Sequence, residues 1–218
     1  METASTNANF ALERDGRKAI LTFTREDRLN ALDAQTFRDL LVTLEAIEAD
    51  REVGVVIVTG RGRAFVAGAD VTGYSDCTVL EYVEFQRLGR LVYDRIERLR
   101  QPVIAAVNGY ALGGGFELVL VAADFISAEE ARALGIVNRV VPAEELMPAA
   151  HALADRILKR APLAVEMAKQ LVNDGLQASL PTAITQEMRM TATLSATADA
   201  REGIAAFIEK RPPEFTGH

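Results

Sequence analysis

The chain has 218 residues, with 24 lysines and arginines against 31 aspartates and glutamates, so its formal charge is −7 and its pI is about 5.0. Apolar residues make up 49% and charged residues 25%, a composition typical of globular proteins and not of disordered or fibrous ones. The acidic balance argues against nucleic-acid binding, and no apolar run approaches the roughly 18 to 20 residues that cross a bilayer.

The N-terminal half alternates strand and helix patterns. Residues 10–24 predict a β-hairpin, because two apolar segments flank Asp15-Gly16, a strong signal for a tight turn. Asp33 precedes a stripe of apolar residues at helical spacing that ends near Ile47. The β-branched run 53–59 predicts a strand that is covered on both faces.

The pattern continues through the middle of the chain. Residues 79–99 predict a long amphipathic helix, and 103–107 predict a second buried strand. A turn rich in glycine then leads into a short apolar helix expected over 116–123. These elements extend the alternation of strand and helix, which indicates an α/β fold.

A change of pattern divides the chain into two parts. Ser127-Ala-Glu-Glu130 forms a capping box that predicts a short helix, and the apolar run 136–141 predicts a strand. The sequence beyond this run is helical almost to the C-terminus. We therefore expect a core of mixed strands and helices over 1–142 and a helical region over 143–218.

Two loops of very small residues each follow a predicted buried strand. They are Ala67-Gly-Ala-Asp70 and Gly113-Gly-Gly-Phe-Glu117. Small residues let a ligand approach the main chain, and backbone N–H groups from two loops that converge on one point form an oxyanion hole. The simpler interpretation is that the glycines serve only turns and close packing, and for either loop alone the two interpretations weigh equally. Their occurrence as a pair favours function.

Glu117 is the strongest candidate for acid–base chemistry. It lies one turn into an otherwise apolar helix, where desolvation raises the pKa of a carboxyl group toward the useful range. The alternative is a glutamate that merely stabilises the start of the helix. Neither a dinucleotide fingerprint nor a P-loop lysine is present. One cysteine, Cys77, and two histidines predict no disulfide, no metal site and a reducing, cytoplasmic location.

Several motifs together carry a resemblance to a known family. They are 64–70, 102–117, Asn30-Ala-Leu-Asp33, 127–142 and Glu202-Gly-Ile-Ala-Ala-Phe207, and they occur in the expected order. The chain thereby resembles the crotonase (enoyl-CoA hydratase/isomerase) superfamily, above all its bacterial enoyl-CoA hydratases. The resemblance covers the chain from about residue 10 to its end.

The resemblance implies a spiral of ββα units with a helical C-terminal region that mediates trimers or dimers of trimers. It implies an acyl-CoA thioester as substrate, with coenzyme A as part of the substrate and no permanently bound cofactor. The N–H groups of Ala69 and Gly114 match the oxyanion hole, and Glu117 matches the first of two catalytic glutamates. Residues implied at the substrate or its CoA are Arg25, Arg28, Leu29, Ala31, Ala67, Gly68, Asp70, Gly113, Phe207 and Lys210. Each loop arginine is also explained by a solvated charge.

The chain departs from the family after Phe125. In relatives a strand, a loop with the second glutamate, a glycine-rich stretch and a helix follow, whereas here Phe125 runs almost directly into the capping box at Ser127. Roughly forty residues are absent by comparison with the family, and the link left between the two helices is unusually short. A true deletion, an engineered excision and an omitted segment all fit the sequence, and natural loss is the least favoured because both flanks match the family.

The leading functional prediction is an enoyl-CoA hydratase, which adds water reversibly and syn to 2-trans-enoyl-CoA thioesters. Hydration in the family uses two carboxyl groups, and only Glu117 remains, because Glu130 is explained as the partner of Ser127 in the capping box. The alternatives are a Δ3-Δ2-enoyl-CoA isomerase that uses Glu117 alone and a catalytically silent acyl-CoA-binding subunit. RNA binding, known for one relative with a lysine-rich helix, is disfavoured because the matching segment 33–50 is mainly acidic.

Overall fold

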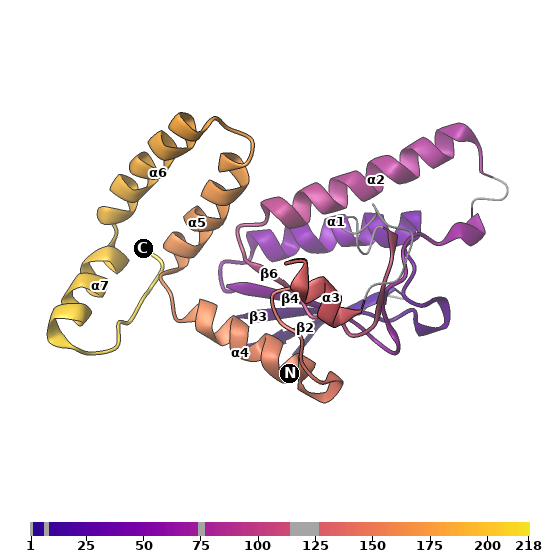
Figure 1. Cartoon of the computed structure of the whole chain (residues 1–218), viewed down its shortest axis with the longest axis horizontal. Helices are drawn as coiled ribbons and strands as arrows, with labels where there is room; N and C mark the ends of the chain where they lie inside the picture. Colours follow the sequence, from indigo (N-terminus) through magenta and orange to yellow (C-terminus); the bar gives the residue numbers. More distant parts are fainter. Residues whose placement is uncertain (1, 7–8, 74–76, 114–126) are drawn as a thin grey trace.

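The computed structural model describes residues 2–6, 9–73, 77–113 and 127–218, and the structural statements below concern these residues. Its strands are β1 (Glu2–Thr6), β2 (Phe10–Asp15), β3 (Lys18–Phe23), β4 (Val55–Gly60), β5 (Ala64–Val66), β6 (Val103–Ala105) and β7 (Tyr110–Ala111). Five of them form a central sheet in the order β1-β2-β3-β4-β6 (Figure 1). The first three are antiparallel neighbours, and β4 runs parallel to both β3 and β6. In addition, β5 and β7 pair in parallel.

The predicted hairpin is confirmed as β2 and β3. Phe10 lies opposite Phe23 and Asp15 opposite Lys18 in the register, and Gly16 supplies the turn with a positive φ of 57°. The predicted cover of the next strand on both faces is also confirmed, because its residues 55–57 are all 0% exposed. No pattern in the sequence predicts β1, whose polar residues lack the apolar alternation of a strand; it is held by backbone pairing to β2.

Helices cover both faces of the sheet. On one side lie α1 (Ala34–Ala49) and α2 (Val79–Arg98), and on the other lies α4 (Leu146–Leu158) (Figure 1). Val56 belongs to the apolar cluster that includes residues of α1 and α2, whereas Val55 and Ile57 join residues of α4. This division follows from the alternation of side chains along a strand. The predicted helical segments 33–50 and 79–99 are thus confirmed, with Asp33 capping the first.

Three further helices form the C-terminal part: α5 (Pro162–Gly175), α6 (Leu180–Ser195) and α7 (Ala198–Glu209). They project away from the sheet and from α1 and α2 (Figure 1). The short 3₁₀ helices are η1 (Glu26–Arg28), η2 (Val71–Gly73) and η5 (Ala143–Glu145). The helical character predicted for the C-terminal region is confirmed. Within the described residues no helix is long and apolar enough to cross a membrane.

The segment after the capping box is partly as predicted. Helix α3 (Ala128–Ala133) begins with the expected reciprocal bonds between Ser127 and Glu130. The strand predicted over 136–141 is wrong: the N–H groups of its first two residues donate to Ala131 O and close the end of α3. An apolar run forms a strand only beside a partner, and no described strand pairs with this one. The helix predicted over 116–123 lies outside the described residues.

Candidate active site

The first small-residue loop, 67–70, is held along one side by the segment that precedes α1. Leu32 N–H donates to Gly68 O at 2.8 Å, and Asp70 N–H donates to Leu32 O at 2.8 Å. These two bonds form an isolated parallel bridge between Leu32 and Ala69. In such a bridge the residues on either side of Ala69 make the bonds, so the N–H of Ala69 itself points away from Leu32. The loop therefore presents this N–H on its other side.

The second small-residue loop meets the first. Leu112 N–H donates to Val66 O at 3.0 Å, which continues the pairing of β5 with β7. Gly68 has a φ of +95°, and a Cβ placed there would lie 3.1 Å from Leu112 O and 3.7 Å from the Cα of Gly113. The contact thus requires glycine at position 68. The structure brings Gly68 and Gly113 together, whereas Gly114 and Glu117 lie outside the described residues.

Arg25 is the most constrained charged residue near these loops. Its Nη1 donates to Ala31 O and to Asp33 Oδ2, each at 2.9 Å, and its Nη2 donates to Asp70 Oδ2 at 2.9 Å. The side chains of Arg25 and Asp70 are only 18% and 11% exposed. The guanidinium, expected at the CoA moiety, is therefore occupied by groups of the protein itself.

Asp70 is ionised in this environment. The hydroxyl of Thr72, its backbone N–H and the guanidinium of Arg25 all favour the charged form, and together they lower the pKa of Asp70 despite its partial burial. Its Oδ2 accepts from Arg25, while its Oδ1 accepts from Thr72. Asp70 is thus a fixed anion that is neutralised by Arg25, not a candidate acid.

The other residues expected at the CoA moiety between 25 and 31 divide into two kinds. Arg28 ends η1, is half exposed, and has Asp27 at 3.9 Å as its ion-pair partner. Leu29 adopts a positive φ of 52°, and its carbonyl accepts from Ala67 N–H at 3.0 Å. The carbonyl of Ala31 accepts from Arg25. Arg28 is the side chain of this set that remains accessible to an anionic ligand.

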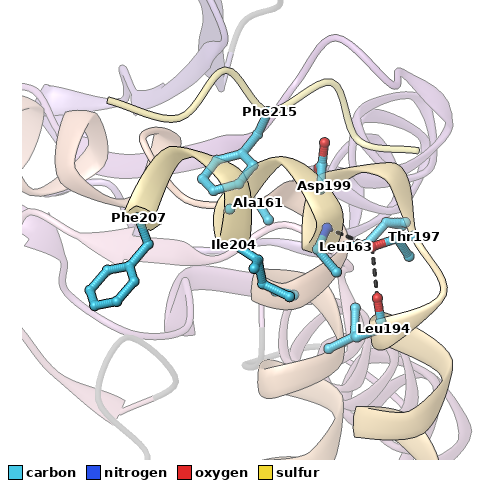
Figure 2. A pocket seen from close by; sticks show the side chains of 11 residues that line it. Ala161, Leu163, Leu194, Thr197, Asp199, Ile204, Phe207 and Phe215 are labelled. Carbon is cyan, nitrogen blue, oxygen red and sulfur yellow. Dashed lines mark hydrogen bonds between the residues drawn. The ribbon is translucent and has the colours of Figure 1, made fainter. Parts of the chain in front are cut away.

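Phe207 and Lys210 lie in a different part of the molecule. Phe207 belongs to α7 and is 86% exposed, and Lys210 follows this helix with a positive φ of 55°. Phe207 lines a cavity of about 410 Å³ between α5, α7 and the C-terminal tail, together with Ile204 and Phe215 (Figure 2). Figure 1 shows α7 at one end of the molecule, away from the sheet and α3. Phe207 and Lys210 are therefore not brought together with the small-residue loop 67–70 within one chain.

Two asparagines that are not among the predicted site residues hold the backbone beside the site in place. Asn30 is 1% exposed, and its Nδ2 donates to Ala64 O at 2.8 Å and to Arg61 O at 3.1 Å. Asn108 accepts from Gly60 N–H at 3.0 Å and donates to Gly62 O at 2.9 Å. Both bind the turn between β4 and β5. In the sequence, these asparagines are marked only by their positions in two of the family motifs, 30–33 and 102–117.

The described residues offer no substitute for the second carboxyl group at this site. Glu130 is engaged at the start of α3, where the N–H and hydroxyl of Ser127 lower its pKa. No cluster of three or more histidine, cysteine, aspartate or glutamate side chains able to hold a metal occurs among the residues described. Among the described residues, the arrangement leaves the backbone N–H of Ala69 outside the bridge to Leu32.

The sequence model of the enoyl-CoA hydratase/isomerase family matches the chain over residues 15–128 and 121–218. The chain belongs to this family. It is 34% identical to the short-chain-enoyl-CoA hydratase of Clostridium acetobutylicum, in an alignment covering 94% of this chain and 97% of that protein. It is also 34% identical to the crotonyl-CoA hydratase of Syntrophomonas wolfei, with 95% and 97% covered.

Solved structures of enoyl-CoA hydratases share the fold. The enzyme from Bacillus anthracis matches with a TM-score of 0.90 at 29% identity, over 96% of this chain and all of that one. The enzyme from Mycobacterium smegmatis matches with a TM-score of 0.89 at 26% identity, over 96% and 99%. The predicted crotonase fold is thereby confirmed for this enoyl-CoA hydratase/isomerase family member.

The same comparisons bear on the departure after Phe125. The alignment with the C. acetobutylicum hydratase spans 252 positions, more than the 218 residues of this chain, so the relative contributes residues that have no counterpart here. The two stretches matched by the family model meet at 121–128. Both findings agree with a family segment that is missing at this point of the chain.

Proposed function

We propose that the protein is an enoyl-CoA hydratase that adds water reversibly to short 2-trans-enoyl-CoA thioesters. The observation that supports this proposal is the contact of Gly68 with Leu112 and Gly113, next to Ala69, whose N–H makes no bond in the bridge to Leu32. Coenzyme A enters as part of the substrate, and no permanently bound cofactor is needed. The names of the relatives in the comparisons support the same substrate class.

The chemistry proceeds through an enolate of the thioester. The N–H groups of Ala69 and Gly114 donate to the thioester oxygen and stabilise the charge that develops there. Glu117 takes a proton from water as the hydroxyl oxygen bonds to C3, and the electrons of the C2=C3 bond move to the thioester oxygen. The protonated Glu117 then delivers the proton to C2 as the enolate collapses. Glu117 takes and returns the proton on one face, which makes the addition syn, whereas in the family a second carboxyl group also helps to orient the water.

The missing segment specifically favours a second candidate, a Δ3-Δ2-enoyl-CoA isomerase. In this reaction Glu117 removes a proton from C2 of a 3-enoyl thioester and returns it to C4, so the double bond moves into conjugation and no water is held. The oxyanion hole serves in the same way. A single carboxyl group is the whole catalytic requirement, whereas hydration in the family uses two.

Absorbance of the conjugated enoyl thioester distinguishes the two reactions. We expect the protein to consume crotonyl-CoA in water, and Glu117→Gln to lower kcat by about 10²- to 10⁴-fold, the usual contribution of a general acid–base group. Glu129→Gln removes an exposed carboxylate of α3 and serves as the matched control. Undiminished hydration in Glu117→Gln would contradict the assignment of the base. A rise of absorbance from a 3-enoyl-CoA without hydration would establish the isomerase, and binding without either reaction would establish a silent subunit.

The proposal includes self-association and a cytoplasmic location. Phe207 and Lys210 lie far from the oxyanion loops of their own chain, so a contribution of theirs to CoA binding requires a neighbouring subunit. Helices α5, α6 and α7 project from the core as an assembly region would. A trimer or a dimer of trimers meets both conditions. Arg28 is the described side chain in the 25–31 loop best placed to meet an anionic CoA group.

A further inference from the structure

Three segments meet at the side chain of Arg25: the loop before α1, the N-cap of α1, and the loop that carries Ala69. The guanidinium donates to Ala31 O, to the carboxylate of Asp33 and to that of Asp70, all at 2.9 Å. Its planar fork makes such multiple directed contacts possible, which a lysine cannot reproduce. Arg25 therefore cross-links the two backbone segments that the Leu32–Ala69 bridge also joins.

We propose that Arg25 is a positioning residue of the oxyanion site, which fixes Asp70 against the 31–33 segment and so holds the Ala69 N–H in the direction of the thioester oxygen. This inference rests on the proposed function of the Ala69 N–H as an oxyanion donor. It assigns to Arg25 a role other than contact with the CoA moiety. Arg25 itself does not touch the reacting atoms.

Charge explains why the position of the loop depends on this side chain. Asp33 and Asp70 each place an oxygen 2.9 Å from the same guanidinium, so two carboxylates share one positive charge. Without that charge, the two anions repel each other, and Asp70 is the more buried of them. Asp33 is not free to move, because it caps α1 by accepting from Thr36 N–H at 2.7 Å. Repulsion between the two carboxylates therefore displaces the loop around Asp70.

A displacement of this loop acts on catalysis in a defined way. The donor bonds of an oxyanion hole count most in the transition state, and a misplacement of about 1 Å costs up to 10²-fold in rate. Loss of a contact made in the transition state lowers kcat and kcat/KM equally and leaves KM almost unchanged. Loss of a direct contact with CoA would instead raise KM. Comparing the change in kcat with the change in KM therefore distinguishes a positioning residue from a residue that binds CoA.

The test compares Arg25→Gln with Arg14→Gln. Arg14 is likewise a partly buried arginine (25% exposed) that pairs with an aspartate, Asp50, but it lies on the β2–β3 hairpin. The first measurement uses no ligand: hydrogen–deuterium exchange of the Leu32 and Asp70 amides, which donate across the bridge. We expect Arg25→Gln to speed their exchange by at least about 10-fold and Arg14→Gln to leave it unchanged. Unchanged exchange in Arg25→Gln would overturn the inference.

The second measurement uses crotonyl-CoA and the chromophoric analogue 2,4-hexadienoyl-CoA. We expect Arg25→Gln to lower kcat by about 10²-fold with KM within about 3-fold, and to abolish the red shift that a polarised thioester carbonyl gives to the bound analogue. Arg25→Lys, which keeps the charge without the fork, should restore part of both signals. A rise in KM alone, or a retained red shift, would overturn the positioning role. If the wild-type protein itself gives no shift, the proposed function fails, and the exchange measurement still decides whether Arg25 fixes the loop.

Discussion

At the scale of single residues, Gly68 combines a backbone conformation that favours glycine with a position in the candidate site. Its φ of +95° disfavours any side chain, and a Cβ would press on Leu112 O at 3.1 Å. We expect Gly68→Ala to lower the free energy of unfolding by about 1–3 kcal/mol through strain. We also expect it to lower kcat for crotonyl-CoA, because the two loops must move apart. Urea unfolding and steady-state kinetics measure the two effects.

The control variant Gly135→Ala introduces backbone strain without a contact between the two loops. Gly135 has a φ of +74° but nothing lies within 4 Å of a Cβ built there. This variant should lose stability to a similar degree and keep its kcat. An equal loss of kcat in both variants would show that instability, and not the approach of the loops, reduces the activity.

Residues of the site differ in how far the sequence could predict them. The small residues of the two loops stand out in the sequence because their composition is local, and the structure brings Gly68 and Gly113 together as expected. The family resemblance predicts Arg25 at CoA, and its pairing with Asp70 could not be predicted, because the two residues lie 45 positions apart. Only the fold, by placing Leu32 beside Ala69, creates it. The roles of Gly114 and Glu117 remain predictions.

At the scale of elements, the sequence predicts well those features that depend on residues close together in the chain, such as helix starts. The predicted capping box at Ser127 and the predicted helix start at Asp33 are confirmed, because each depends on residues only three positions apart. The strand predicted over 136–141 failed for the opposite reason. A strand requires a neighbour supplied by the rest of the chain, and the apolar pattern carries no information on that neighbour.

One lysine makes three of the hydrogen bonds that attach α5 to the core. Nζ of Lys169 donates to Ile96 O, Leu99 O and Gln101 O at 3.3, 2.7 and 2.9 Å, around the end of α2. Burial lowers the pKa of this lysine. We expect Lys169→Met to lower the free energy of unfolding by about 1–3 kcal/mol, because the three carbonyls lose a charged donor away from water. The midpoint of urea unfolding gives the change.

Lys159→Met provides the control for this prediction. Lys159 follows α4 and is exposed, so its replacement leaves no buried carbonyl without a donor. Its urea midpoint should stay close to that of the wild type. If both lysine variants unfold at the wild-type midpoint, the bonds of Lys169 do not anchor α5 to the core.

At the scale of the whole molecule, the C-terminal helices carry apolar side chains that the chain itself leaves uncovered. On α6, Leu180 is 73%, Ile184 48% and Met188 68% exposed, and their spacing of four places them on one face of the helix. Exposed apolar surface on this scale marks an interaction site more often than a free surface. Phe207 and Lys210, which the resemblance implies at CoA, lie away from the small-residue loop 67–70 of their own chain, as the proposed assembly requires.

The trimer or dimer of trimers implied by the family resemblance gives an expected mass of three or six times 23.7 kDa, which light scattering or sedimentation of the purified protein measures. Met188→Glu places a charge on the uncovered face of α6 and should weaken the assembly by at least about 10-fold, because an unpaired charge is costly to bury. Val42→Glu makes the same change at a residue of α1 that is 71% exposed, and should leave the mass unchanged. A monomeric wild-type protein, or an assembly as sensitive to Val42→Glu as to Met188→Glu, would contradict an interface on α6. If Met188→Glu dissociates the assembly and also raises KM for crotonyl-CoA, the CoA site extends across the subunit boundary, since Met188 is remote from the oxyanion loops of its own chain.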